Sequence, residues 1–171
     1  RLTIRQTRQA AVREAVKSSC ALKIGHLNVR SLTAHLDEVN LLLLQKQLDV
    51  LCLSETFLTE KIDSSALLFP GYTISRRDRR NRTGGGVAIL CRATLKTEQL
   101  RVPTNGTTLE SLWLQITSRS TIVVGVLYRP PLGPTAPAID CLHHQLTLVL
   151  ARDRPTFLLG DVNFDTSGQA R

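Results

Sequence analysis

Short apolar runs alternate along the chain with segments in which apolar side chains recur every three or four positions. The run from Val50 to Leu53 is typical of a strand covered on both faces. Before it, His35 to Leu48 has leucines at helical spacing, and Ala21 to Val29 has the pattern of another strand. Strand, helix and strand with short links predict a βαβ unit with parallel pairing. We expect Ser31 or Thr33 to cap the helix.

After residue 58 the pattern changes to shorter elements. Alternating apolar and polar positions predict several strands, and a second helix follows a proline-rich bend. The expected strands are Tyr72–Ser75, Val87–Cys91, Leu95–Val102, Thr108–Thr117 and Ser120–Leu127, followed by a helix over Ala138–Arg152 and a last apolar run at Phe157–Leu159. Trp113 is expected in the core. The whole pattern predicts an α/β domain.

Length and charge narrow the picture further. The 171 residues suit one domain, which we place at 21–171, after a basic N-terminal arm over 1–20. The formal net charge of +8 makes a polyanionic partner as plausible as a merely solvated basic surface. No apolar run approaches the roughly 20 residues that a membrane span needs. We therefore expect no membrane partner.

The four cysteines lie far apart, without the spacing of metal ligands. We interpret them as reduced core thiols, which favours an intracellular location. The chain starts at Arg1 and contains no methionine, so we expect it to be a piece of a longer polypeptide.

A loop between two predicted strands is crowded with arginine and ends in three glycines. It lacks the spacing of a P-loop and precedes a strand rather than a helix. Contact with a nucleic-acid backbone and a solvated turn are equally good interpretations of this loop. Its basic residues are Arg76, Arg77, Arg79, Arg80 and Arg82.

Polar side chains stand at the ends of predicted strands, beside loops. Glu55 directly follows a buried strand, where a divalent cation would compensate its charge. The set has two carboxylates, two carboxamides and a phenol, with no nucleophilic Ser or Cys beside a His. This chemistry suits attack by water assisted by a hard cation such as Mg²⁺. The five residues are Asn28, Glu55, Tyr128, Asp161 and Asn163.

Six ordered strings carry a family resemblance over about Leu22 to Asp165: HLNVRSL, VLCLSETFL, GGGVAIL, ESLWLQI, GVLYRPP and FLLGDVNF. The chain resembles the endonuclease/exonuclease/phosphatase superfamily. It is most similar to the apurinic-endonuclease-like domain of non-LTR (LINE-type) retrotransposons. The resemblance implies a four-layer α/β sandwich, two mixed β-sheets flanked by helices. It also implies cleavage of a DNA phosphodiester with Mg²⁺, or with Mn²⁺ in its place.

The resemblance also implies a role for each residue of this set. Glu55 would be the principal metal ligand, and Asn28 would assist at the metal and the phosphate. Tyr128 would donate a hydrogen bond to the scissile phosphate. Asp161 would orient or deprotonate the attacking water, and Asn163 would help to place the water and the phosphate.

Further expectations concern neighbouring residues and partners. Glu110 would have a supporting role, and Arg129 and the arginine-rich loop would contact the DNA backbone. The parent polyprotein would carry a fused reverse transcriptase and act in the nucleus. One departure is that the later Asp and the Ser-Asp-His block of the family do not occur after FLLGDVNF. We therefore expect the C-terminal strands to be missing and the activity to be weakened or abolished.

Two alternatives stay open. One is a non-catalytic remnant that binds nucleic acid through its arginines, with salt-sensitive affinity. The other keeps the fold and changes the substrate to a small-molecule phosphate or a lipid headgroup.

Overall fold

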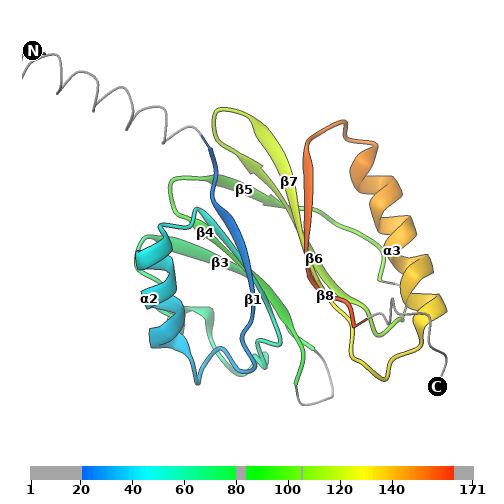
Figure 1. The fold of residues 1–171 in the computed structure, drawn as a ribbon, viewed down its shortest axis with the longest axis horizontal. Helices are drawn as coiled ribbons and strands as arrows, with labels where there is room; N and C mark the ends of the chain where they lie inside the picture. The colour runs from blue at the N-terminus through cyan, green and yellow to red at the C-terminus, as the bar shows by residue number, and fades with distance from the viewer. Residues whose placement is uncertain (1–20, 80–83, 105, 164–171) are drawn as a thin grey trace, which may run out of the picture.

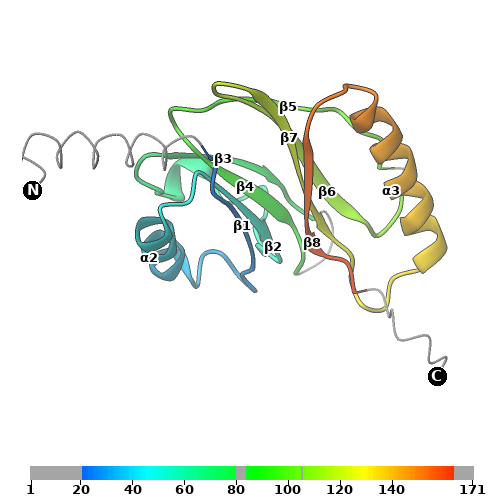
Figure 2. The ribbon, with the colours of Figure 1, turned by 45° about the horizontal axis from the view of Figure 1, so that its top comes forward.

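The computed structural model describes residues 21–79, 84–104 and 106–163. Two four-stranded sheets lie face to face, and one helix covers the outer face of each sheet (Figure 1). The turned view in Figure 2 shows the same order of layers: helix, sheet, sheet, helix. The predicted four-layer α/β sandwich is confirmed.

The first sheet contains the predicted βαβ unit. Its strand order is β1 (Ile24–Asn28), β2 (Val50–Ser54), β4 (Val87–Arg92) and β3 (Tyr72–Arg77). Helix α2 (Leu36–Lys46) connects β1 to β2, and these two strands pair in parallel. The other pairs of this sheet are antiparallel, so the sheet is mixed.

The second sheet repeats this arrangement at the other end of the chain. Its strand order is β5 (Lys96–Gln99), β6 (Glu110–Thr117), β7 (Thr121–Tyr128) and β8 (Thr156–Asp161). Helix α3 (Thr135–Leu150) connects β7 to β8, which pair in parallel, whereas β5, β6 and β7 pair in antiparallel fashion. Each mixed sheet therefore holds one parallel pair.

The main core lies between the two sheets, and alternation along the strands explains why β2 is apolar throughout. Val50 and Cys52 point into the core between the sheets, whereas Leu51 and Leu53 pack beneath α2. Successive side chains of a strand point to opposite faces, so a strand covered on both faces needs apolar residues at every position.

Trp113 is fully buried under α3, as the alternation of β6 predicts. Its Nε1 donates a hydrogen bond to Gln145 Oε1 of α3 at 2.9 Å. A buried indole N–H needs such a partner, because leaving it unpaired costs on the order of 1–3 kcal/mol. Trp113 is therefore a core residue and not a surface stacking group.

The predicted cap of α2 is wrong. His35 occupies the N-cap position without a side-chain hydrogen bond, and neither Ser31 nor Thr33 caps the helix. The reason lies in the preceding loop, where the backbone N–H groups of Ser31 and Leu32 donate to carbonyls just after β2. This segment is tied to the end of the neighbouring strand instead of to the helix.

Other predicted element boundaries also differ from the observed ones. Helix α3 starts three residues earlier than expected, since Pro137 falls in its first turn, where a missing N–H costs no helical hydrogen bond. Strand β5 spans four residues and not eight. The chain leaves the sheet after Leu100, and the carbonyl of Pro103 accepts a hydrogen bond from Gln145 Nε2 at 2.7 Å.

Three cysteines, Cys52, Cys91 and Cys141, are buried and free, as expected of core thiols. Burial raises the pKa of both Cys52 and Cys91 to about 12, which keeps these thiols protonated. Cys20 and the basic arm over 1–20 lie outside the described residues. In the part of the chain that is described, no helix combines the length and apolar character of a membrane span.

Candidate active site

The carboxyl ends of the two parallel strand pairs meet at one end of the sandwich. In the first sheet Asn28 is the register partner of Ser54, the residue before Glu55. In the second sheet Tyr128 is the register partner of Asp161. Strand β8 contacts both β1 and β2, so the two pairs adjoin each other. Ligand sites of layered α/β folds collect outside such strand ends.

Asn28 joins the two carboxylates that sequence analysis singled out. Its Nδ2 donates to Glu55 Oε1 at 2.8 Å and to Asp161 Oδ2 at 3.1 Å. Asn28 and Asp161 are 133 positions apart in the chain. Because both acids contact a single nitrogen atom, they lie close enough to act on one ion and its bound water. The fold thus brings these three residues together.

The other side of the Asn28 amide has the chemistry of a metal ligand. Its Oδ1 is buried and has no hydrogen-bond donor among the described residues. The orientation of the amide follows from its neighbours, since only the NH₂ group can face two carboxylates. A buried acceptor without a partner is rare in proteins and calls for an explanation. A cation bound beside Glu55 would provide one.

The available donors fit Mg²⁺ better than a softer metal. In the described ranges no three His, Cys, Asp or Glu side chains converge into a closed metal cage. Mg²⁺ does not need such a cage, because it is held by one or two carboxylates together with water and substrate phosphate. Glu55 and the amide oxygen of Asn28 would hold the ion, and bound Mg²⁺ would polarise a phosphoryl oxygen.

Tyr128 ends β7 and lies beside the acids. Its hydroxyl is hydrogen-bonded to Glu55. The pKa of Tyr128 is raised, first by burial and then by the negative charge of Glu55, while the positive charge of Arg79 lowers it. The phenol therefore stays protonated at neutral pH and can donate a hydrogen bond.

Glu110 and Arg79 form the wall next to this phenol. Glu110 is the register partner of Tyr128, and its Oε1 forms an ion pair with Arg79 Nε. The Arg79 guanidinium carbon lies 5.6 Å from the centroid of the Tyr128 ring, a cation–π distance. The second oxygen, Glu110 Oε2, accepts from the backbone N–H of Gly86 at 2.6 Å. The supporting role expected of Glu110 thus has a physical basis in these contacts.

Gly86 allows this wall to approach β2. Its φ is +84°, and a Cβ there would lie 2.6 Å from the hydroxyl of Thr56. Only glycine fits both conditions. The three glycines after the arginine-rich loop thus form a packing segment against the residues that follow Glu55.

Protein groups hold the described side chains of the arginine-rich loop, and its contact with a nucleic-acid backbone stays a prediction. Arg76 forms a two-point ion pair with Asp78, at 2.7 and 3.1 Å. Arg77 Nη1 donates to the carbonyl of Ser111 at 3.1 Å, and Arg79 is held by Glu110. These three side chains are attached to protein groups, so the loop is not simply solvated. Arg80 and Arg82 lie outside the described residues.

Arg129 lies inside the protein, which corrects its assignment as a contact to the DNA backbone. Only 3% of the residue is exposed. Its guanidinium donates to the carbonyl of Asn163 at 2.8 Å and to Thr135 Oγ1 at 2.7 Å. Asn163 Nδ2 in turn donates to the carbonyl of Arg129 at 2.9 Å. Arg129 therefore ties together β7, the start of α3 and the segment after β8.

A half-buried polar pair, His26 and Ser54, lies behind the site and was not among the predicted residues. His26 lies two positions before Asn28 on the same face of β1, and its Nε2 is 3.1 Å from Ser54 Oγ. Burial lowers the pKa of His26, and the negative charge of Asp161 partly offsets this effect. His26 is thus neutral at pH 7, and it contacts Ser54, the residue before Glu55. The sequence feature that could have indicated this pair is a histidine inside an otherwise apolar predicted strand.

Left-handed backbone conformations cluster around the site. Positive φ values occur at Arg30, Ser31, Glu55, Phe57 and Asn163, which all follow strands that end there. Such conformations are costly for residues other than glycine and are typical of functional sites.

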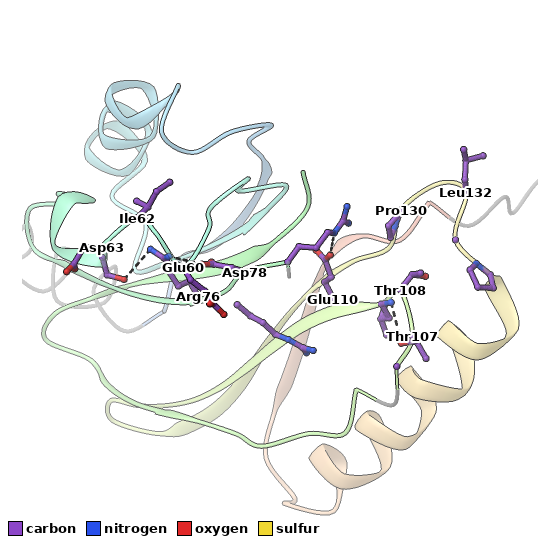
Figure 3. Close-up of a pocket in the computed structure, with 17 residues that line it drawn as sticks. Glu60, Ile62, Asp63, Arg76, Asp78, Thr107, Thr108, Glu110, Pro130 and Leu132 are labelled. Atoms are coloured by element: carbon purple, nitrogen blue, oxygen red, sulfur yellow. Dashed lines mark hydrogen bonds and ion pairs between the residues drawn. The ribbon is translucent and has the colours of Figure 1, made fainter. Parts of the chain in front are cut away.

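A groove of roughly 1380 Å³ adjoins this wall (Figure 3). Arg76 and Asp78 line it on the side of the first sheet, and Thr107 and Thr108 line it on the other side. Glu110 lies between these two sides, whereas Asn28, Glu55 and Asp161 are not part of the lining. The groove therefore runs past the site and meets it at Glu110.

The charges around Tyr128 give opposite expectations for two variants. In a Tyr72→Phe background Tyr128 is the one remaining tyrosine, since the chain has two. Glu55→Gln should lower the pKa of Tyr128, because it removes the carboxylate charge that raises it. Arg79→Gln should raise the pKa, because it removes the cation that lowers it. Phenolate absorbance against pH measures both shifts, and shifts of equal sign would contradict this arrangement.

Two packed mixed sheets with a helix outside each, and an acid–amide–acid cluster at their joined strand ends, place the chain among the layered α/β sandwich proteins. The model of the Endonuclease/Exonuclease/phosphatase family matches residues 25–169. The chain belongs to this family. No curated protein sequence matches the chain significantly.

Solved structures share the fold at low sequence identity. An AP endonuclease from Archaeoglobus fulgidus is 20% identical with a TM-score of 0.63, over 82% of this chain and 56% of that one. The endonuclease domain of TRAS1, a telomere-specific non-LTR retrotransposon, is 15% identical with a TM-score of 0.63, over 85% and 62%. The mannosyl-6-phosphatase Bt3783 from Bacteroides thetaiotaomicron is 18% identical with a TM-score of 0.61, over 87% and 68%. The chain thus spans less than two thirds of the two endonucleases.

Proposed function

We propose that this domain hydrolyses phosphodiester bonds of DNA as a Mg²⁺-dependent endonuclease, with Mn²⁺ able to replace Mg²⁺. The observation that carries the proposal is the Asn28 amide, which joins Glu55 to Asp161 and leaves its own oxygen without a donor among the described residues. Two acids and an amide oxygen at one point are suited to hold a hard cation and to activate water for attack on a phosphate.

Each residue has a distinct part in the proposed reaction. Glu55 and Asn28 Oδ1 bind the ion. Asp161 accepts a proton from the attacking water while its carboxylate is oriented by Asn28 Nδ2. The water oxygen bonds to phosphorus as the P–O bond to the leaving sugar oxygen breaks, and that oxygen takes up a proton from solvent. Tyr128, protonated at neutral pH, donates its hydroxyl to a phosphate oxygen. Asn163, whose Nδ2 is held by Arg129, keeps the segment after Asp161 in place and offers its remaining amide oxygen to water.

DNA as the substrate rests on charge and on the fold. The net charge of +8 favours a polyanion, and two proteins of similar fold are endonucleases. The described arginines of the loop are held by Asp78, by Ser111 and by Glu110, so they do not act as free phosphate contacts. DNA contact would then depend on other basic side chains, among them Arg80.

The biological setting follows from the retrotransposon resemblance. In this setting the domain nicks target DNA in the nucleus, and a reverse transcriptase fused in the parent polyprotein extends the nick. The fold shared with the TRAS1 endonuclease domain favours this setting.

A second candidate is a phosphatase that acts on a small molecule. The fold shared with a mannosyl-6-phosphatase favours it, as does the mixed charge of the groove, where Arg76 faces Asp78. The same acids would serve either substrate, since both reactions break a P–O bond.

Plasmid nicking tests the proposal. The purified chain should convert supercoiled plasmid to the open circle with Mg²⁺ or Mn²⁺, and not with EDTA. Phosphate release from mannose 6-phosphate, measured in parallel, should be much slower. Hydrolysis of the sugar phosphate without nicking would instead support the phosphatase. If the chain binds DNA but hydrolyses nothing, and if Glu55→Gln binds equally well, the result would support a non-catalytic remnant that binds nucleic acid.

A further inference from the structure

Phe57 is an exposed aromatic side chain directly beside the proposed metal site. It lies two residues after Glu55, and 39% of it is exposed. Two residues span at most about 7 Å, so the backbone of Phe57 lies no farther from Glu55 than about the spacing of two neighbouring nucleotides. The groups proposed to carry the reaction do not include Phe57.

Hydrogen bonds hold the backbone under this ring. The N–H of Phe57 donates to the carbonyl of Gly85 at 2.8 Å, and the N–H of Thr56 donates to the carbonyl of Gly86 at 3.2 Å. The segment after Glu55 is therefore fixed against the glycine segment. The Phe57 ring has a defined place and is not a freely moving surface group.

One part of the ring rests on glycine backbone. A Cβ built at Gly84 would lie 3.5 Å from Cε1 of Phe57 and 3.9 Å from Cζ. The absence of a side chain at Gly84 lets the ring lie directly against the main chain there. With 39% of the residue exposed, part of the apolar side chain stays accessible to a second flat group.

This conformation lowers stability in two ways. The φ of Phe57 is +55°, a left-handed value that strains the backbone of a bulky residue. The exposed ring also gives up the apolar burial that Phe69, 5% exposed, obtains in the core. Costs of this kind are typical of residues kept for binding.

We infer that Phe57 is a stacking platform for a nucleobase next to the scissile phosphate. This inference rests on the proposed nuclease function and adds a residue that binds the base to those that act on the phosphate. An aromatic ring that rests on glycine backbone and stays partly exposed suits the flat face of a base, and every base has such a face. The platform thus selects unstacked or flexible DNA at the cut, with little preference for sequence.

The inference predicts a dependence on aromaticity. Phe57→Leu and Phe57→Ala should weaken binding of an oligonucleotide by roughly 5- to 150-fold, which corresponds to the stacking energy of one base. Phe57→Trp and Phe57→Tyr should bind like the wild type. Leu44→Ala is the matched control: Leu44 is 75% exposed and lies on α2, and its loss should leave binding unchanged.

Binding is measured by the fluorescence of an oligonucleotide with one 2-aminopurine, in EDTA so that no cleavage occurs. Stacking on the ring should quench the probe in the wild type and in the Tyr variant. Thermal unfolding of each variant verifies the fold. Wild-type affinity in Phe57→Leu, or equal losses in the Leu, Trp and Tyr variants, would overturn the platform while DNA binding stands. A wild type that binds no DNA would overturn the nuclease proposal and the platform together.

Discussion

Glu55→Gln should lower the rate of DNA nicking by on the order of 10²–10³ or more while the protein stays folded. The substitution keeps the size of the side chain and an oxygen that can accept from Asn28 Nδ2. It removes the negative charge that we propose binds the cation. Nicking rates at saturating and at limiting Mg²⁺ measure this loss, and higher Mg²⁺ should restore only part of the activity.

The control for this loss is Glu98→Gln, which removes the same charge from an exposed position on β5. This strand belongs to neither of the two parallel pairs whose carboxyl ends form the site. We expect it to leave nicking and the Mg²⁺ requirement unchanged. Full activity in Glu55→Gln would show that the joined acids are not the metal site. An equal loss in both variants would indicate that net charge, rather than position, matters.

Gly160→Ala should lower the free energy of unfolding by about 2–4 kcal/mol, from overpacking together with backbone strain. Gly160 has φ +151°, and a Cβ there would lie 2.1 Å from the carbonyl oxygen of Leu127 on β7. That neighbour is backbone and cannot turn aside, so β8 must shift. The shift would move Asp161, the next residue, away from Asn28. Urea unfolding and nicking assays measure the two effects.

Gly71→Ala separates the two causes. Gly71 has φ +80°, and a Cβ there would meet nothing within 4 Å. It should therefore show strain alone, about 1 kcal/mol, and normal nicking. If Gly160→Ala is no more destabilising than Gly71→Ala, the close approach of β8 to β7 at this point does not matter for the fold.

Local pattern accounts for most of the layered architecture. The continuous apolar run of β2 predicted a strand covered on both faces, and Val50 and Leu51 do pack into different cores. Helical spacing predicted α2 and α3, although their ends were off by one to three residues. These features are readable because side-chain periodicity reports which face of an element is buried.

Side-chain periodicity does not predict which side chains of distant elements become partners. Arginines in a glycine-bordered loop look alike in sequence, yet Arg76 pairs with Asp78 and Arg79 with Glu110. Arginine is usually exposed at the protein surface, yet Arg129 is buried against the segment after β8. A charged group is buried only where partners compensate its desolvation, and those partners come from the whole fold.

The residues alone thus establish the strands, the two helices and the acids and amides at their ends, because period and strand-end position are local properties. That Asn28 reaches Asp161 across 133 positions, that Glu110 holds Arg79 over Tyr128, and that Phe57 is left open beside Glu55 follow from the packing of two sheets. Hydrogen bonds form over about 3 Å, and only the folded chain brings such groups that close.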